Sequence, residues 1–391
     1  MAREITLNHI CKIEGHANLN LKIEKNKVKK CELQAFEGAR FFEALVIEKN
    51  IEDIQEIVSR ICGICSSAHS VCSIQGLEDA LGIKPTAQQK FIREMLMFGE
   101  RIRSHATHLY FLALPDYFNV PSILEIGKEH KSKIDDALKI ITLGNQLVEK
   151  FGGREMHPFL KIKEEMEEVD YEKILQQLKN TKPIIMRTIK LFSEINYPEI
   201  SRETDYLSLH QEEDYVVLKE NKPYMLGAMA RINNNHNQLE PETKKILNEI
   251  MKKKDLEFPL KNPFYNNICQ AIEILEVVNR TIKNIENAPK KEETQKIKYH
   301  SGHGVSAVEA PRGTLFHEYK IDKNGKIIYC NIITPTCQNL NMMEQDITAL
   351  VNELLKKNTS KEEIVKHMEK LIRAYDPCFS CSTHFLKVNW E

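Results

Sequence analysis

The sequence predicts a mainly α-helical protein with small β hairpins, an α+β fold. Long stretches near 86–114, 131–151, 171–195 and 262–287 carry apolar residues at helical spacing. Two regions, one near each end of the chain, alternate apolar and polar residues on either side of a turn. The 391 residues, 42% of them hydrophobic, are enough for a substantial buried core.

The first hairpin is expected close to the N-terminus. Residues 17–23 alternate apolar and polar side chains, the tripeptide Lys-Asn-Lys follows as a turn, and residues 28–36 form the return strand. Helical spacing begins at 51–61, and the long helical stretches then form a bundle. A short strand-rich insertion around 205–231 is expected to interrupt this bundle. Two further helices are expected before the end of the chain, over 339–356 and 360–374.

The second hairpin is predicted from residues 314–321 and 326–333, which flank an Asn-Gly turn. Such a hairpin brings residues 334–336 back toward residues 310–312. Pro377 stops the last helix just before the end of the chain. Since no repeat, low-complexity tract or linker is visible, we expect one domain.

The charge is balanced, with 55 basic and 56 acidic residues and a formal net charge of -1. No global field therefore favours nucleic acid or an anionic membrane, and partners are expected to bind local surfaces. No apolar run approaches the roughly 20 residues that a membrane span needs, and the first residues lack the layout of a secretory signal. We expect a cytoplasmic protein that neither binds nucleic acid nor inserts directly into a membrane.

Ten cysteines are many for a cytosolic protein, where metal or redox ligands are more common than disulfides. Four of them form two CxxC pairs at opposite ends of the chain, Cys62 with Cys65 and Cys378 with Cys381. The others stand alone on apolar or strand-like stretches, where a cysteine is usually a small buried hydrophobe. These six are Cys11, Cys31, Cys72, Cys269, Cys330 and Cys337.

Two CxxC pairs can converge on one tetrathiolate metal site. Structural zinc is the simplest interpretation, but zinc ribbons usually bring their pairs within about 20 residues of each other. Pairs so far apart favour a buried, preorganised centre. Their flanks carry Arg60, His69, Asp376 and His384, which a closed zinc site does not need. Thiolates favour nickel, copper(I), zinc or iron over magnesium or calcium, and spacing alone does not choose among the four.

The segments around the two pairs, RICGICSSAH and DPCFSCSTH, are similar to the two signatures of the nickel-iron hydrogenase large subunit. The resemblance extends from end to end of the chain, through six weaker matches in the same order. These are 12–16 (KIEGH), 40–43 (RFFE), 105–116 (HATHLYFLALPD), 152–158 (GGREMHP), 309–313 (EAPRG) and 334–339 (TPTCQN). It implies a helical bundle that buries its metal centre between the N- and C-terminal segments.

The resemblance also implies the metals. Cys62 and Cys378 would be terminal nickel ligands, and Cys65 and Cys381 would bridge nickel to an iron that carries carbon monoxide and cyanide. The reaction implied is reversible splitting of dihydrogen into a hydride and a proton, which needs a base for the proton. The Cys378 thiolate and the Arg312 guanidine are the two candidate bases, although a guanidinium is normally always charged and its role is mainly electrostatic.

Further residues match functional positions of that family. Asp116, Pro311 and Asp376 would form a canopy around Arg312, with the two carboxylates orienting its fork by bidentate hydrogen bonds. Glu14 would relay protons, although without the resemblance it reads as an exposed strand residue. Thr336 would hydrogen-bond a cyanide.

A second metal, magnesium or iron, would bind Glu43, the Ile332 carbonyl and His384. Four other histidines are either close to the centre or satisfied core residues: His69, His105, His108 and His157.

The partners follow from the same resemblance. The chain has no glycine-rich dinucleotide fingerprint and no spare cysteine cluster, so electrons would leave through a separate iron-sulfur small subunit. Its short length resembles the cytosolic branch, which couples to a nicotinamide, deazaflavin, ferredoxin or sulfur-reducing partner. Lys12 and Cys337-Gln338 depart from the common family pattern, but none of them is a proposed ligand.

Two alternatives share this fold. A quinone-oxidoreductase subunit generally lacks the cysteine pairs, which argues against it, whereas a hydrogen-sensing regulatory hydrogenase keeps them. The last seven residues, 385–391, resemble the tail that a maturation endopeptidase removes after nickel insertion. The mature domain would then span residues 1–384, and an ordinary frayed terminus is the alternative.

Overall fold

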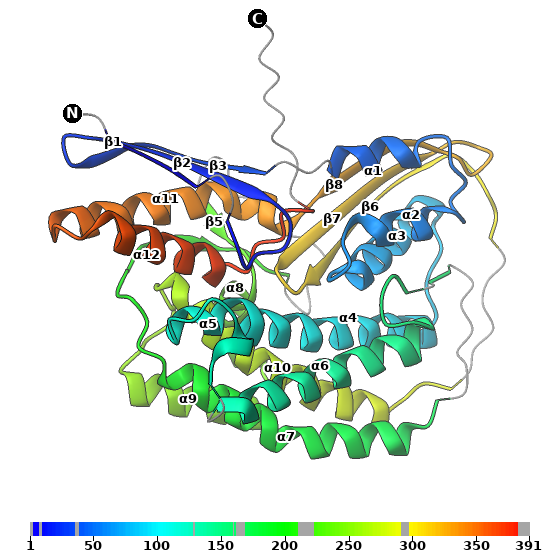
Figure 1. Ribbon diagram of the computed structural model, residues 1–391. Helices are drawn as coiled ribbons and strands as arrows, with labels where there is room; N and C mark the ends of the chain where they lie inside the picture. Colours follow the sequence, from blue (N-terminus) through cyan, green and yellow to red (C-terminus); the bar gives the residue numbers. More distant parts are fainter. Residues whose placement is uncertain are drawn as a thin grey trace, which may run out of the picture.

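The computed structural model describes residues 3–7, 10–35, 39–127, 130–158, 160–161, 169–209, 223–290 and 297–381. Its described part is mainly helical, with small sheets, as the sequence predicts. Figure 1 shows a lower layer of long helices and an upper layer that holds the two larger sheets. The division into a domain over 1–384 and a tail over 385–391 stays a prediction.

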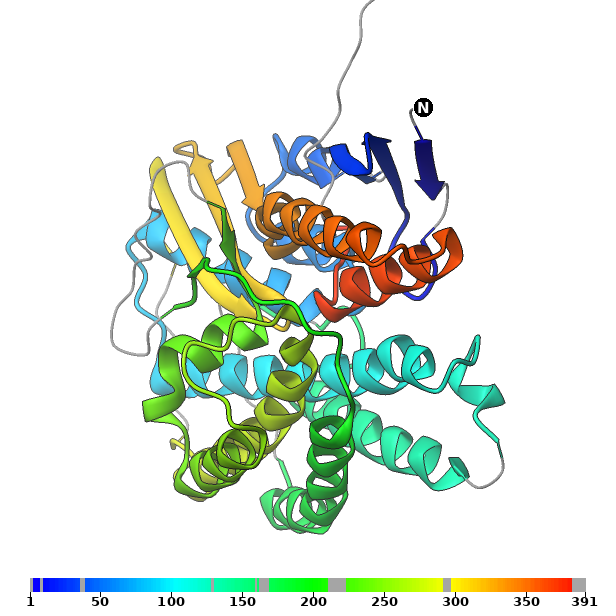
Figure 2. The same ribbon diagram turned by 90° about the vertical axis from the view of Figure 1, so that its left-hand side faces the viewer.

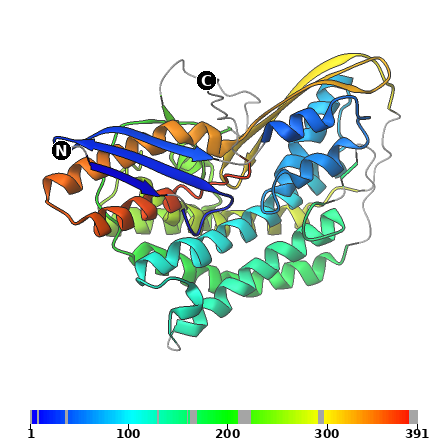
Figure 3. The ribbon, with the colours of Figure 1, turned by 45° about the horizontal axis from the view of Figure 1, so that its top comes forward.

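The N-terminal sheet has three antiparallel strands, β1 (Arg3–Leu7), β2 (Ala17–Glu24) and β3 (Lys27–Ala35). The predicted hairpin is β2–β3, and β1 is a strand that the sequence analysis missed. Apolar side chains alternate along β2, so that every second one is buried. The neighbouring strand β3 packs against α11 (Pro335–Lys356). α12 (Lys361–Ala374) packs against α11 in turn. Figure 3 shows α11 beneath this sheet, beside the second one.

The helical layer is built on α4 (Ala87–Thr107), which starts with a reciprocal capping box between Thr86 and Gln89. It packs closely against α6 (Lys131–Gly152), because a Cβ on Gly144 would lie only 2.6 Å from the Gly99 carbonyl oxygen. Figure 2 shows the same layer below the two larger sheets from another side. Its other members are α7 (Tyr171–Glu194), α9 (Pro241–Lys254) and α10 (Asn266–Glu286), and α4 continues through a π-helical turn (His108–Ala113) into α5 (Leu114–Tyr117).

The second three-stranded sheet consists of β6 (Gly302–Ala310), β7 (Gly313–Ile321) and β8 (Ile327–Ile333), in that order and antiparallel. The predicted hairpin is β7–β8, and β6 was not predicted. α3 (Ser66–Leu81) packs across β6 and β7. α1 (Ala39–Val46) packs against β8, and α2 (Ile54–Val58) against α3.

Three sequence-based expectations need correction. The stretch around 205–231 is not strand-rich where it is described: β4 (Asp205–Tyr206) and β5 (Tyr224–Met225) form a two-residue parallel pair, and α8 (Ala228–Asn235) is a helix that packs against α10. Residues 210–222 lie outside the described residues. The helix expected over 51–61 is only α2 plus a short 3-10 turn. Cys11 is exposed rather than buried, because it lies in an irregular segment outside the sheet.

Candidate metal centre

Two cysteine pairs from opposite ends of the chain meet in the interior. The Sγ atoms of Cys62, Cys65, Cys378 and Cys381 all lie within 4.8 Å of one another, and all four residues are buried. Across the pairs, Sγ of Cys62 is 3.5 Å from that of Cys378, and Sγ of Cys65 is 3.4 Å from that of Cys381. This arrangement brings together the tetrathiolate site that the sequence predicts.

The chemistry of this cluster fits soft or borderline metal ions. Four sulfurs packed together in a dry interior have mainly one another as hydrogen-bond partners. Hydrogen bonding from Cys378 lowers the pKa of Cys62 well below its ordinary value, whereas burial raises the pKa of Cys378. A thiolate is thus stabilised by neighbouring thiols, and a cation bound among them would stabilise the remaining thiolates.

Glu100 on α4 holds the first pair in place. Its carboxylate oxygens accept from the backbone N–H groups of Ser67, at 2.6 Å, and Ala68, at 3.1 Å. These groups belong to the first turn of α3, which begins directly after Cys65, and that turn leaves donors without a helical partner. Burial raises the pKa of Glu100 to about 7. The sequence analysis missed this residue, whose one signal is a carboxylate among the apolar positions of α4.

The second pair follows a turn at Asp376, whose φ of 51° is uncommon outside glycine but tolerated by aspartate. Pro377 comes next, and the chain then runs beside the N-terminal segment. The Phe379 N–H donates to the Glu14 carbonyl at 2.8 Å, and Glu14 and Cys378 form a parallel β-bridge. The Cys378 N–H donates to Thr336 Oγ1 at 2.8 Å.

Glu14 faces the second pair. Its Oε2 accepts from Sγ of Cys378 at 2.9 Å and from the Ser380 N–H at 3.2 Å. Burial raises the pKa of this carboxyl group. Glu14 is therefore not the exposed strand residue that local sequence suggests.

Arg312 lies on the turn between β6 and β7 and is 5% exposed. Its Nε donates to the Asp376 carbonyl at 2.7 Å and its Nη2 to Asp376 Oδ1 at 2.9 Å, while Nη1 is buried without a partner among the described residues. The preceding carbonyl, that of Pro311, accepts from Arg231 at 2.8 Å. Beside Arg312 lies a cavity of about 10 Å³, which is lined by Cys65, His69, Ala310, Arg312, Leu315, Pro335, Thr336, Cys378 and Cys381.

Asp116 does not orient Arg312 as the sequence analysis expects. Its carboxylate pairs with Arg373 and Lys12, and the described residues show no ion pair between it and Arg312. Arg373 lies on α12 and Asp116 on α5, and the ion pair between them neutralises the Asp116 carboxylate. Within the described part of the chain, the one carboxylate that holds the fork of Arg312 directly is that of Asp376.

Two of the three residues expected to bind a second metal, Glu43 and Ile332, contact each other. Glu43 Oε1 accepts from the Ile332 N–H at 2.8 Å, which joins α1 to β8. His384, the third expected ligand, lies outside the described residues.

All four histidines named from the sequence take part in hydrogen bonds. His69 Nδ1 is 3.1 Å from Nε2 of His317, His105 donates to Glu273 at 2.8 Å, and His157 to the Ser59 carbonyl at 2.7 Å. His108 bonds at both ring nitrogens, to Gln270 and to the Arg373 carbonyl. His317 and Gln270 carry no local signal, because each stands alone on an apolar strand or helix.

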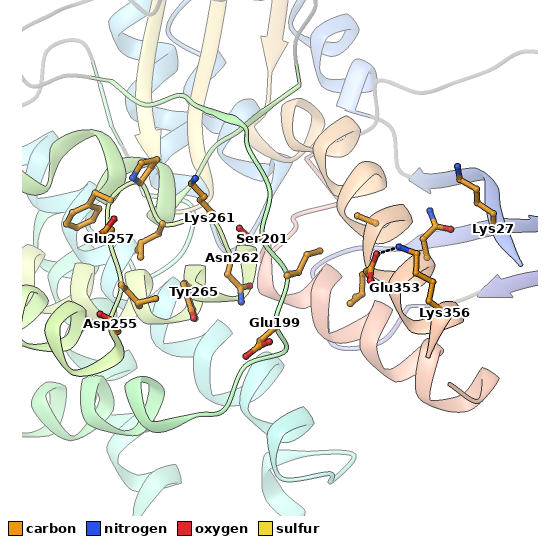
Figure 4. Close-up of a pocket in the computed structure, with 18 of the residues that line it drawn as sticks. Lys27, Glu199, Ser201, Asp255, Glu257, Lys261, Asn262, Tyr265, Glu353 and Lys356 are labelled. Atoms are coloured by element: carbon orange, nitrogen blue, oxygen red, sulfur yellow. Dashed lines mark hydrogen bonds and ion pairs between the residues drawn. The ribbon is translucent and has the colours of Figure 1, made fainter. Parts of the chain in front are cut away.

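A much larger cavity, of about 1320 Å³, lies elsewhere in the described part of the chain. It opens between the 255–265 segment, α11 and the turn of the β2–β3 hairpin. Figure 4 shows its charged side chains, among them the Glu353–Lys356 pair, projecting from separate elements. None of the four clustered cysteines lines this cavity, so it is separate from the cysteine cluster.

Comparison with known proteins agrees with this geometry. A profile of nickel-dependent hydrogenases matches residues 40–151 and 154–384. The alpha chain of sulfhydrogenase 2 from Pyrococcus furiosus is 32% identical, over 98% of this chain and all of that protein. The A chain of the F420-non-reducing hydrogenase from Methanothermobacter marburgensis is 27% identical, over 97% of this chain and 94% of its own. The fold matches that of a NAD+-reducing [NiFe]-hydrogenase in the H2-reduced state, with a TM-score of 0.82 at 19% identity, over 98% and 99% of the two chains.

Proposed function

This chain belongs to the nickel-dependent hydrogenase family, in which it is a catalytic large subunit, and we propose that it interconverts dihydrogen with protons and electrons at a nickel-iron centre on Cys62, Cys65, Cys378 and Cys381. The convergence of these four buried sulfurs carries the proposal. The quinone-oxidoreductase alternative does not account for these four thiols.

Each cysteine has a role in this proposal. Cys62 and Cys378 would hold nickel, and Cys65 and Cys381 would hold both nickel and an iron that carries carbon monoxide and cyanide, as the family resemblance implies. Metals bound there would supply the redox chemistry for heterolytic splitting of dihydrogen, and residues of the chain would take up the proton. The four Sγ atoms lie within 4.8 Å of one another, which supports a shared centre, and the choice of terminal and bridging residues follows the family resemblance.

The proton leaves through residues of the chain. The Cys378 thiol donates directly to Glu14, so a proton on Sγ can pass to Oε2 over 2.9 Å. Burial raises the pKa of the Glu14 carboxyl, which makes it a better proton acceptor than an exposed glutamate.

Arg312 supplies a fixed positive charge beside the cavity. Its position between Asp376 and the thiols keeps its pKa above the ordinary value despite burial, so it stays a guanidinium and does not act as a resting base. Its Nη1, which has no partner among the described residues, can donate to a ligand in the cavity that Arg312 lines. Pro311 turns the chain at this point, and the Thr336 hydroxyl, which accepts from Cys378 N, still has its own proton for a cyanide.

A magnesium or second iron ion is proposed at Glu43, the Ile332 carbonyl and His384. The hydrogen bond from the Ile332 N–H to Glu43 keeps these two residues side by side, which supports a shared site.

Large subunits of this kind work with small and electron-transfer partners. We propose that electrons pass first to an iron-sulfur small subunit and then to a nicotinamide-, deazaflavin-, ferredoxin- or sulfur-linked one. A maturation endopeptidase is proposed to act on the tail.

No helix in the described ranges is long and apolar enough to cross a membrane. The cytoplasmic location expected from the sequence stays a prediction.

Infrared spectroscopy of the purified complex tests the proposal. Bands of metal-bound carbon monoxide and cyanide are expected, together with about one nickel per chain. A zinc-only protein without such bands would contradict it. Steady turnover with an artificial dye is expected of an enzyme, whereas a hydrogen sensor would show the bands with little turnover.

A further inference from the structure

His108 lies where the regular helix α4 gives way to a π-helical turn, His108–Ala113. Such turns are rare and often occur at functional sites, because they re-aim side chains. His108 is 1% exposed and points between α10 and the end of α12.

Both ring nitrogens of His108 contact oxygen atoms. Nδ1 is 2.5 Å from Oε1 of Gln270, and Nε2 is 2.6 Å from the carbonyl oxygen of Arg373. The carbonyl of Arg373 can only accept a hydrogen bond. His108 must therefore carry a proton on Nε2.

The hydrogen bond between the Gln270 amide nitrogen and Asp376 fixes the orientation of the amide group. Its nitrogen donates to Oδ2 of Asp376 at 2.9 Å. Since Asp376 is ion-paired with Arg312 and accepts hydrogen bonds there, the amide NH2 must face this carboxylate. The amide oxygen then faces His108, so Nδ1 must carry a proton as well.

We propose that His108 is a buried imidazolium and that His108 and Gln270 are positioning residues, which hold Asp376 and through it the Arg312 fork. The chain of contacts runs from His108 to Gln270, to Asp376 and to Arg312, and each of these residues is 5% exposed or less. In a neutral imidazole, one ring nitrogen would carry a lone pair that faces either the Gln270 amide oxygen or the Arg373 carbonyl oxygen. This repulsion would be costly, because bulk water does not reach the buried ring. The proposal rests on the function proposed for Arg312.

The carboxylates near this chain of contacts also pair with other cations, Asp376 with Arg312 and Asp116 with Arg373 and Lys12. Asp376 lies behind Gln270, and its carboxylate receives hydrogen bonds from both Gln270 and Arg312. Asp116, on the short helix α5 that follows the π-helical turn, pairs with Arg373. The contacts from Gln270 and Arg312 also fix Asp376 in its uncommon backbone conformation, directly before Pro377 and the second cysteine pair.

Neutron diffraction from the deuterated wild-type enzyme tests the protonation state without a variant. Deuterium is expected on both Nδ1 and Nε2 of His108. A bare nitrogen at either position would overturn the imidazolium assignment, whether or not the protein turns over dihydrogen, so this outcome is separate from the proposed function.

The positioning role is tested with Gln270→Leu and His108→Gln. Both are expected to retain nickel, to lower the turnover number at least about tenfold and to leave the KM for dihydrogen within about twofold. The matched control is Tyr110→Phe, which removes a buried hydrogen bond to Thr188 from the same π-helical turn. Turnover of Gln270→Leu at the level of Tyr110→Phe would overturn the role, and loss of activity in the wild type itself would contradict the proposed function instead.

Discussion

Glu14 and Cys378 are 364 positions apart, yet they contact each other through both side chain and backbone. The thiol of Cys378 donates to the carboxylate, and the two residues form a parallel bridge. The N-terminal segment thereby closes one side of the C-terminal cysteine pair. A proposed proton acceptor and a proposed metal ligand are thus held together by main-chain hydrogen bonds as well as by a side-chain contact.

Replacing Glu14 by glutamine should separate metal binding from proton transfer. An amide can still accept from the Ser380 N–H but cannot take a proton from Cys378, so turnover should fall by a factor on the order of 10². Nickel content should stay that of wild type. Glu24→Gln, on β2 of the same sheet, is the control, and equal turnover in the two variants would remove Glu14 from the proton route.

Replacing Cys62 or Cys378 by serine should abolish both nickel retention and activity. An alcohol is a much weaker ligand for a soft or borderline metal than a thiolate, and two metals need all four donors. Elemental analysis of the purified variants measures this directly. Cys11→Ser, which changes an exposed thiol, should retain the metals. A Cys378→Ser protein with full nickel would show that the ligand assignment is wrong.

Arg312→Lys should keep the metals but lower dihydrogen oxidation at least about tenfold. A lysine ammonium cannot make the paired contacts that Nε and Nη2 make with Asp376. Dye-linked turnover and infrared bands should be measured on one preparation. Arg187→Lys, at an exposed ion pair with Asp136, is the matched control. Normal turnover with normal bands would exclude Arg312 from catalysis.

Acid should destabilise the protein in part through His105. Burial lowers the pKa of His105 to about 4, from 6.5, and its buried Nδ1 has no partner among the described residues that could accept a second proton. The folded state therefore binds fewer protons than the unfolded state, so the stabilisation is complete above pH 6.5 and is lost as the pH falls toward 4. The loss is about 1.4 kcal/mol per pH unit, or about 3.5 kcal/mol over this interval.

His105→Gln keeps a donor for Glu273 but cannot titrate. The free energy of unfolding, measured with denaturant at about pH 7 and about pH 4, should therefore depend less on pH in this variant. His303→Gln, at an exposed position, should behave as wild type. An unchanged pH dependence in His105→Gln would contradict the assignment.

Residues 385–391 are predicted to be absent from active enzyme. Intact-mass spectrometry should find active protein ending at His384 and nickel-free precursor ending at Glu391. Fully active protein that retains Trp390 and Glu391 would show that this tail is not a maturation signal.

The sequence alone determined the type of chemistry. Two CxxC pairs specify a thiolate site whatever the fold, and the long helices and two hairpins follow from apolar spacing and turn residues, which act locally. The resemblance to a known family then pointed to Glu14, Arg312 and Asp376.

Only the tertiary structure showed which side chains contact one another around the site. Asp116 pairs with Arg373 instead of Arg312, Glu100 holds the first turn of α3, and Gln270 joins His108 to Asp376. β1 and β6 became strands because a neighbouring strand satisfies their backbone groups. Such contacts depend on which helices and strands pack together, and a hydrogen bond between residues far apart in the chain leaves no periodic pattern in the sequence.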